Sequence, residues 1–131
     1  MTPEPPTADR PRDVLVVEDD TKLAAVIVRA CERAGFTCRT ATSGDQALWA
    51  INDGRPDALV LDIMIPHPSG IEVCRHLRNI GYDGPIVAIS ARSGPDDQAA
   101  AQRAGADRFL AKPFALADLV GRLDELLLGH P

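Results

Sequence analysis

The sequence lacks three features that would place it in a specialised class of protein. It has no uninterrupted run of 18 or more apolar residues, the length a membrane-spanning helix needs, so no membrane contact is expected. Its N-terminus lacks the basic-then-apolar order of a secretory signal, so the cytoplasm is the expected location. The net charge of −5 and the pI near 5.0 leave no basic excess, which argues against direct nucleic-acid binding.

Cysteine is scarce and is not spaced for metal binding. Cys31, Cys38 and Cys74 are an odd number and match no zinc-binding pattern. We expect Cys31 and Cys74 on helices and Cys38 on a strand, each as a small, reduced packing residue. None of the three histidines has a metal-ligand spacing either.

The composition that remains is that of one soluble domain. The chain has 131 residues, of which 45% are hydrophobic and 25% charged. Residues 1–12, MTPEPPTADRPR, are rich in proline and lack apolar periodicity, so we expect a disordered N-terminal tail there. The folded domain is expected over residues 13–128 and a short tail over 129–131. The residues after the last helix are too few for an output domain, which leaves a stand-alone domain or a piece of a longer regulator.

Short β-branched segments alternate with segments of helical spacing five times. The expected strands are 13–17, 36–40, 57–62, 85–90 and 108–111, and the expected helices cover 23–34, 44–53, 71–80, 96–104 and 116–128. This alternation predicts an α/β fold, a doubly wound parallel sheet with helices on both faces. The strand at 36–40 is the more polar and is expected near an edge, and Trp49, on the second helix, is expected to be a packing residue.

Chemically active side chains follow four of the expected strands. In chain order they are Glu18, Asp19 and Asp20 together, then Asp62, Ser90 and Lys112. Because parallel strands bring their carboxyl ends to one edge of the sheet, these side chains should share a site. Clustered carboxylates need a cation, and oxygen-only ligands favour Mg²⁺. Together with a lysine and a hydroxyl, this set suits a phosphoryl group in transfer.

Four motifs carry a family resemblance. LVVEDD, LVLDIMIPHPSG, VAIS-A and GADRFLAKPF are similar, in that order, to the receiver domain of bacterial two-component response regulators. The resemblance covers residues 13–128. It implies a (βα)5 fold of the flavodoxin or chemotaxis-regulator type, with five parallel strands in the order 2-1-3-4-5. It also implies a role in phosphorelay signalling.

The resemblance implies roles for the residues that bind metal and accept the phosphoryl group. Asp62 corresponds to the aspartate that receives the group from a sensor histidine kinase or a phosphotransfer protein. Asp19 corresponds to a direct Mg²⁺ ligand, and Glu18 to an acid that acts through water. The backbone carbonyl of Met64 corresponds to the third protein ligand.

Further roles concern the response to phosphorylation. Ser90 corresponds to the hydroxyl residue that bonds the phosphoryl oxygen, and Lys112 to the lysine that pairs with the group. In the family the peptide bond equivalent to Lys112–Pro113 is often cis. Phe109 occupies the aromatic switch position, but an aromatic residue on a short strand also suits the core, and both roles are compatible.

Several residues depart from the family pattern or have no assigned task. The pattern needs only two acids after the first strand, so Asp20 is expected to cap the first helix or tune local charge. His67 lies in a proline-containing loop that differs from the common one and is expected to be solvated. Arg108 replaces an acid of the face through which many regulators dimerise, which puts a phosphorylation-induced homodimer in doubt. Asp107, Asp118 and Arg122 leave charges for such pairing.

Three functions compete. The leading one is a receiver that catalyses only its own phosphorylation and dephosphorylation and thereby switches its contacts with an output domain or partner. The second is a Mg²⁺-dependent aspartyl phosphatase or phosphotransferase, but such enzymes usually have an acid two residues after the nucleophile, where this chain has Met64. The third is a scaffold that works without phosphorylation, against which the complete set of site residues argues.

Overall fold

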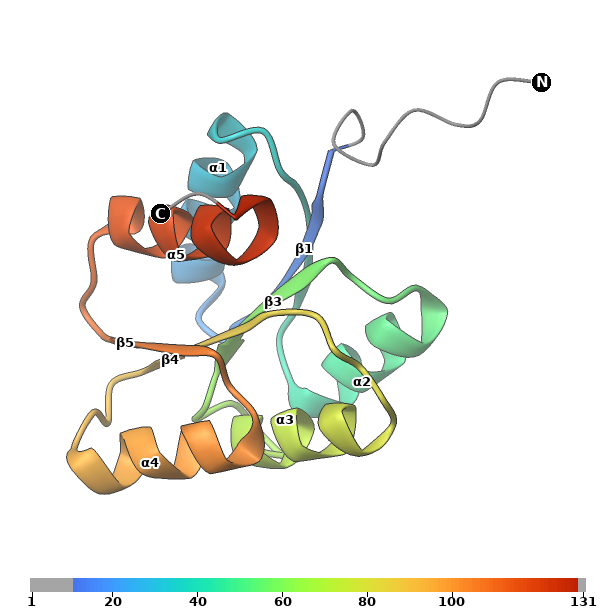
Figure 1. The fold of residues 1–131 in the computed structure, drawn as a ribbon, viewed down its shortest axis with the longest axis vertical. Helices are drawn as coiled ribbons and strands as arrows, with labels where there is room; N and C mark the ends of the chain where they lie inside the picture. Colours follow the sequence, from blue (N-terminus) through green and yellow to red (C-terminus); the bar gives the residue numbers. More distant parts are fainter. Residues whose placement is uncertain (1–10, 130–131) are drawn as a thin grey trace.

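The computed structural model describes residues 11–129, which alternate strand and helix throughout (Figure 1). The elements are β1 (Asp13–Val17), α1 (Thr21–Arg33), β2 (Thr37–Ala41), α2 (Gly44–Asp53), β3 (Ala58–Asp62), α3 (Gly70–Asn79), β4 (Ile86–Ser90), α4 (Pro95–Ala104), β5 (Arg108–Ala111) and α5 (Leu116–Leu128). The strands are parallel in the order β2-β1-β3-β4-β5. The expected fold and strand order are confirmed, and β2 lies at an edge as expected.

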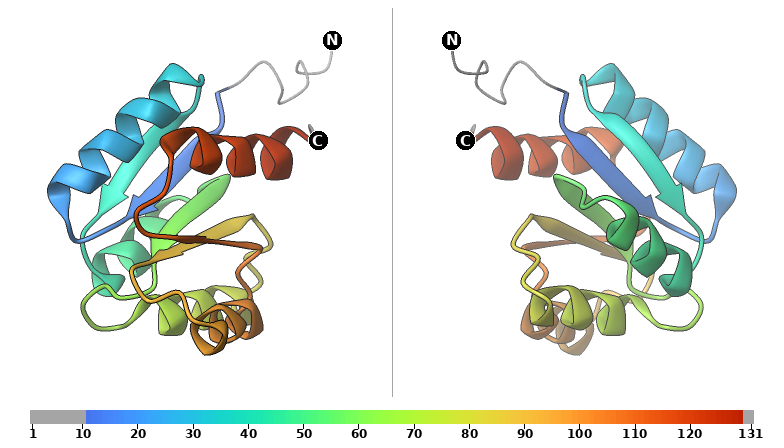
Figure 2. Two further views of the ribbon diagram at one scale, coloured as in Figure 1. Left: turned by 90° about the vertical axis from the view of Figure 1, so that its left-hand side faces the viewer. Right: turned by 90° about the vertical axis from the view of Figure 1, so that its right-hand side faces the viewer.

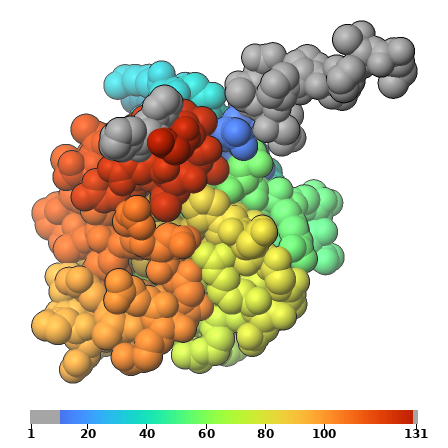
Figure 3. Space-filling model, viewed as in Figure 1, coloured from blue at the N-terminus to red at the C-terminus, as the bar shows by residue number. Residues whose placement is uncertain are grey.

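The sheet is the middle of three layers. Helices α1 and α5 cover one face, and α2, α3 and α4 cover the other (Figure 2). Successive residues of β1 alternate between the two layers, so Leu15 packs with the α2–α3–α4 side and Val16 with the α1–α5 side. Because both faces of the central strands are covered, those strands are continuously apolar rather than alternating. In Figure 3, α3, α4 and α5 cover the face of the molecule that Figure 1 shows.

The cysteines are packing residues, as expected. Cys31 on α1 and Cys74 on α3 are fully buried, Cys38 on β2 is half-buried, and all three are free thiols. The thiol of Cys74 donates a hydrogen bond to the carbonyl of Ala104, at 3.3 Å between sulfur and oxygen. Burial raises the pKa of Cys74 to about 11, which keeps it protonated and unreactive.

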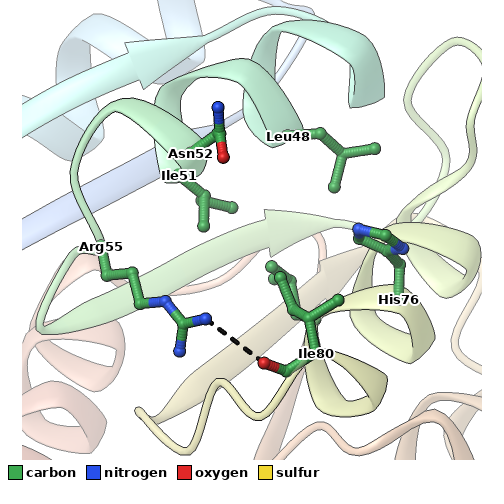
Figure 4. Close-up of a pocket in the computed structure, with 7 residues that line it drawn as sticks. Leu48, Ile51, Asn52, Arg55, His76 and Ile80 are labelled. Carbon is green, nitrogen blue, oxygen red and sulfur yellow. Dashed lines mark hydrogen bonds between the residues drawn. The ribbon is translucent and has the colours of Figure 1, made fainter.

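The expectation that Trp49 is a packing residue is wrong, because the residue is 74% exposed. The buried stripe of α2 contains Gly44, Ala47 and Ile51, and a residue two positions after Ala47 points away from that stripe. A groove lies between α2 and α3 (Figure 4). The residues that line the groove are Leu48, Ile51, Asn52, Arg55, His76, Leu77 and Ile80.

Within residues 11–129, no helix combines the length and the apolar character that crossing a bilayer requires.

One arginine joins α3 to the loops that precede β4 and β5. The guanidinium of Arg78 donates hydrogen bonds to the carbonyls of Tyr82, Gly84 and Gly105 at 2.8–3.1 Å, and it pairs with Asp107 at 3.0 Å. Its side chain is 24% exposed, so water replaces few of these contacts. Arg78 therefore holds the far end of α3 against the start of β5.

We predict that Arg78→Met lowers the free energy of unfolding by about 2–4 kcal/mol, because it leaves several carbonyls without a donor. Urea unfolding followed by circular dichroism measures the change. Arg75→Met on the same helix is the matched control, since Arg75 is exposed, and its effect should stay within about 0.5 kcal/mol. Equal effects of the two substitutions would contradict the role given to Arg78.

Candidate metal and phosphoryl site at the carboxyl edge of the sheet

The structure brings the expected site residues together at one edge of the sheet. Glu18 and Asp19 follow β1, Asp62 ends β3, and carboxylate oxygens from the three lie within 4.8 Å of one another. Ser90 ends β4, directly beside β3 in the sheet. Residues that are tens of positions apart in the chain therefore meet because their strands are parallel and end level with one another.

The acids of the site differ in burial. Glu18 is 0% and Asp62 is 3% exposed, whereas Asp19 is open to solvent. The backbone around them is fixed, since the Glu18 amide donates to the carbonyl of Ala41 at 3.0 Å and the Ile63 amide donates to that of Ile89 at 3.0 Å. The site is thus a rigid, partly covered acidic cluster with one open side at Asp19.

One lysine lies between the two buried carboxylates. The Nζ atom of Lys112 is 2.8 Å from Oδ2 of Asp62 and 2.6 Å from Oε1 of Glu18. The Lys112 amide also donates to the carbonyl of Ser90, at 2.8 Å, which fixes the start of the loop after β5. The Lys112–Pro113 bond is cis, in agreement with the family resemblance, and His67–Pro68 is cis as well.

The pKa values of Glu18 and Lys112 both lie above their ordinary values, but for different reasons. Burial raises the pKa of Glu18 to about 7, even though the contact with Lys112 acts in the opposite sense. Burial lowers the pKa of Lys112, but its contacts with Asp62 and Glu18 outweigh burial, and the pKa lies above its ordinary value. Near neutral pH the lysine is therefore charged, and Glu18 is close to its midpoint.

The donor set fits a small, hard divalent cation. Every side chain in the cluster offers oxygen only, which Mg²⁺ prefers. Oε1 of Glu18 is buried and contacts Lys112, but the angles of that contact do not meet those of a hydrogen bond, so the atom retains acceptor capacity. Among the described residues, the carbonyl oxygen of Met64 accepts no hydrogen bond, while its amide donates to Oδ1 of Asp62 at 2.8 Å.

The remaining expected residues lie at or near this edge in different ways. Asp20 is the N-cap of α1, and its Oδ1 accepts hydrogen bonds from the amides of Lys22 and Leu23 at 3.0 and 3.1 Å, so the capping role is confirmed. His67 is solvated as expected, with 85% of its side chain exposed. Phe109 lies on β5 opposite Ala88, is half-buried, and belongs to neither described core cluster.

Ser90 is buried at the end of β4. Its side-chain oxygen accepts a hydrogen bond from the amide of Arg92, at 3.0 Å. Arg92 lies in the loop that leads to α4, so a movement of the Ser90 side chain would change the hydrogen bonding of that loop. The coupled movement of Ser90 and the Phe109 side chain on phosphorylation stays a prediction.

The charged residues of the face expected for dimerisation are partly engaged inside the chain. Asp107 accepts a hydrogen bond from the amide of Ile86 at 2.8 Å and pairs with Arg78. Arg122 lies 3.8 Å from Glu125 on the same helix. Asp107 is therefore not a free charge for pairing with a second chain, and the homodimer stays a prediction.

Gly44 and Gly70, for which no sequence motif indicates a role, are both buried and contact the loop that follows Asp62. The signal available in the sequence was a glycine at the start of each helix after a Ser N-cap. That signal predicts a helix boundary, but it says nothing about what the glycine contacts.

Comparison with known proteins points in the same direction as the site. The sequence profile of the response regulator receiver domain matches residues 14–124. The transcriptional regulatory protein PrrA of Mycobacterium tuberculosis is 46% identical over 114 residues, which are 87% of this chain and 49% of PrrA. The response regulator MprA of Mycobacterium ulcerans is 45% identical over 114 residues, again 87% of this chain and 49% of the relative.

Solved structures agree. The Francisella response regulator 1452 receiver domain is 31% identical with a TM-score of 0.86, covering 90% of this chain and 98% of that one. The BeF3-activated N-terminal receiver domain of Klebsiella pneumoniae RstA is 29% identical with a TM-score of 0.83, covering 88% and 97%. The chain spans about half the length of PrrA and MprA. By its sequence, its fold and the acidic cluster at the carboxyl edge of its sheet, this chain belongs to the response regulator receiver domain family.

Proposed function

We propose that Asp62 accepts a phosphoryl group in a Mg²⁺-dependent reaction and that the acyl phosphate switches the protein contacts of this domain. The observation that carries the proposal is the placement of Lys112 within 2.8 Å of Asp62, beside a cluster of three acids. A structural salt bridge would need one carboxylate, whereas this lysine contacts two buried ones, and a third acid, Asp19, lies beside them and is open to solvent. That surplus of negative charge suits a bound cation and an incoming phosphoryl group.

The transfer forms one bond and breaks one. A carboxylate oxygen of Asp62 attacks the phosphorus of a phosphohistidine, the phosphorus–nitrogen bond breaks, and the histidine nitrogen leaves with the electron pair. Asp19, Asp62 and the Met64 carbonyl would hold Mg²⁺, with Glu18 acting through water, and the bound ion would supply charge neutralisation for the phosphoryl oxygens. Lys112 remains protonated and offers its charge to the product in place of the contact with Asp62.

Ser90 connects the phosphoryl group to the rest of the domain. After transfer its hydroxyl donates to a phosphoryl oxygen, and the loop that now contacts it through the Arg92 amide shifts accordingly. Phe109, two strands from Asp62 and outside the described core clusters, has the freedom to change its rotamer in response. The readout is then a change in the α4–β5–α5 surface, through which the domain contacts an output domain or a partner protein.

The phosphodonor is proposed to be a sensor histidine kinase or a phosphotransfer protein. An apolar pocket next to Lys112 supports a protein donor rather than a small molecule alone. Val26, which lines this pocket, is 46% exposed. The other lining residues are Leu23, Ala91, Lys112, Pro113, Phe114 and Leu116. The exposed Met64 side chain, in place of a general acid, disfavours the phosphatase alternative, and the complete site disfavours the scaffold.

We predict that acetyl phosphate or phosphoramidate adds one phosphoryl group to the protein only when Mg²⁺ is present. Intact-protein mass spectrometry measures the gain. Asp62→Asn should show none, because the amide is not a nucleophile, whereas Asp53→Asn, which changes an exposed acid on α2, should label normally. Labelling of Asp62→Asn would identify a different acceptor, and an unlabelled wild-type protein would favour the scaffold.

We predict that Lys112→Met lowers the free energy of unfolding by about 3 kcal/mol near pH 8 in ion-free buffer, because two buried carboxylates lose their cation. Mg²⁺ should recover part of the loss. Chemical unfolding with and without Mg²⁺ measures both effects. The control is Lys22→Met, the other lysine, which is exposed on α1 and should change stability by no more than about 0.5 kcal/mol. An unchanged free energy of unfolding in Lys112→Met would refute the shared ion pair.

We predict that Mg²⁺ affinity rises about tenfold between about pH 6 and pH 8 and then levels off. The reason is that burial raises the pKa of Glu18 from 4.5 to about 7, so Mg²⁺ displaces a proton below that pH. The stability of the protein changes in the opposite direction. In ion-free buffer the folded state holds the Glu18 proton more tightly than the unfolded state does, so the free energy of unfolding falls as the pH rises from 4.5 through about 7. Isothermal titration calorimetry in buffers of different ionisation enthalpy counts the released proton. Glu18→Gln should abolish the pH dependence, and its persistence would assign the proton to another group.

A further inference from the structure

The loop between β3 and α3, residues 63–69, is fastened to its surroundings at both ends. At its start, the Ile63 amide donates to the carbonyl of Ile89, and the Ile63 carbonyl accepts from the amide of Gly70, both at 3.0 Å. Further along, the carbonyl of Pro66 accepts from the amide of Gly44, at 3.2 Å. Two glycines, each the first residue of a helix, therefore donate to the loop that follows Asp62.

Gly70 lies so close to the end of β3 that no side chain fits. A Cβ atom at this position would be 2.5 Å from Cα of Ile63 and still closer to the carbonyl oxygen of Asp62. Both atoms belong to the backbone of the acceptor segment, so neither can move without moving Asp62 or its successor. The first turn of α3 thus packs directly against the acceptor backbone.

Gly44 makes the corresponding contact at the other end of the loop. A Cβ atom there would be 2.8 Å from both Cγ and Cδ of Pro68 and closer still to the Pro68 carbonyl oxygen. Ser43 caps the same helix by accepting from the amide of Gln46, so the start of α2 is fixed in place. A side chain at position 44 would therefore displace the loop rather than the helix.

Met64 lies between these two contacts. Its amide bonds Oδ1 of Asp62, and its carbonyl accepts no hydrogen bond from the described residues. Ile65, the next residue, is 4% exposed and packs in the core on the α2–α3 side. The Met64 carbonyl therefore makes no hydrogen bond of its own within residues 11–129, and its position is set by the buried Ile65 side chain and the two glycine contacts.

We propose that Gly44 and Gly70 are positioning residues of the metal site, which fix the Met64 carbonyl by allowing the starts of α2 and α3 to touch the acceptor loop. The inference rests on the proposed function, in which that carbonyl is a Mg²⁺ ligand. Mg²⁺ demands nearly ideal octahedral geometry at 2.0–2.1 Å, whereas Ca²⁺ accepts oxygen ligands at 2.3–2.6 Å in flexible geometry. A loop displaced by a methyl group therefore penalises Mg²⁺ more than Ca²⁺.

The test compares binding of Mg²⁺ alone and Ca²⁺ alone, by titration calorimetry, in the wild-type protein, Gly44→Ala and Gly121→Ala. Gly121 is on α5 with open space around a Cβ, so its variant is the matched control. Gly44→Ala should weaken Mg²⁺ binding by about tenfold or more, the usual effect of residues behind the ligands, and Ca²⁺ binding by about threefold or less. The Met64 amide resonance should shift in ion-free protein, while Gly121→Ala matches wild type throughout.

Gly70→Ala presses on the backbone of Asp62 and Ile63, at the end of a central strand, so it should lower Tm as well as Mg²⁺ affinity. Gly44→Ala keeps the test decisive if Gly70→Ala does not fold, because the atoms it displaces, the carbonyl oxygen and ring of Pro68, belong to the loop and not to a strand of the sheet. If Gly44→Ala lowered the affinities for Mg²⁺ and Ca²⁺ equally and also lowered Tm, the glycines would serve only the stability of the fold, and the inference would be wrong. Unchanged Mg²⁺ affinity in Gly44→Ala would overturn the inference and leave the proposed function intact. Absence of Mg²⁺ binding in wild type would overturn the proposed function itself.

Discussion

Two carboxylates that are almost fully buried share a single ammonium group, and the organisation of the carboxyl edge follows from that imbalance. Glu18 and Asp62 would repel each other strongly without Lys112, and even with it the burial of Glu18 raises its pKa to about 7. A cluster of this kind is costly to maintain for stability alone. It is consistent with a site whose charge balance is completed by a cation and a phosphoryl group.

The fold provides the rigidity that such a cluster needs. The central strands are covered on both faces, and the backbone on either side of the acids is hydrogen bonded to neighbouring strands. The helices begin directly after the site loops, with Asp20 capping α1 and a capping box of Ser69 and Glu72 at α3. Three adjacent acids after β1 are therefore divided between two tasks, since two face the site and the third ends the strand-to-helix turn.

Most of the fold was predictable because its signals are local. Continuous apolar strands, helical stripes and glycine stops gave the element order, and the family resemblance gave the strand order. The error at Trp49 has a local explanation too, since its position lies outside the stripe formed by Gly44, Ala47 and Ile51. The large apolar ring of Trp49 suggests burial, but the position of a residue around the helix axis decides whether its side chain faces the core.

Sequence alone identifies the residues that are chemically able to serve the site, because acids, a hydroxyl and a lysine at strand ends must meet when the strands are parallel. Tertiary structure alone decided how these groups are paired and how far they ionise. The contact of one lysine with two acids, the raised pKa of Glu18 and the fit of Gly44 and Gly70 against the loop after Asp62 depend on distances between segments far apart in the chain. Such distances are set by the packing of helices on the sheet, and no local pattern encodes them.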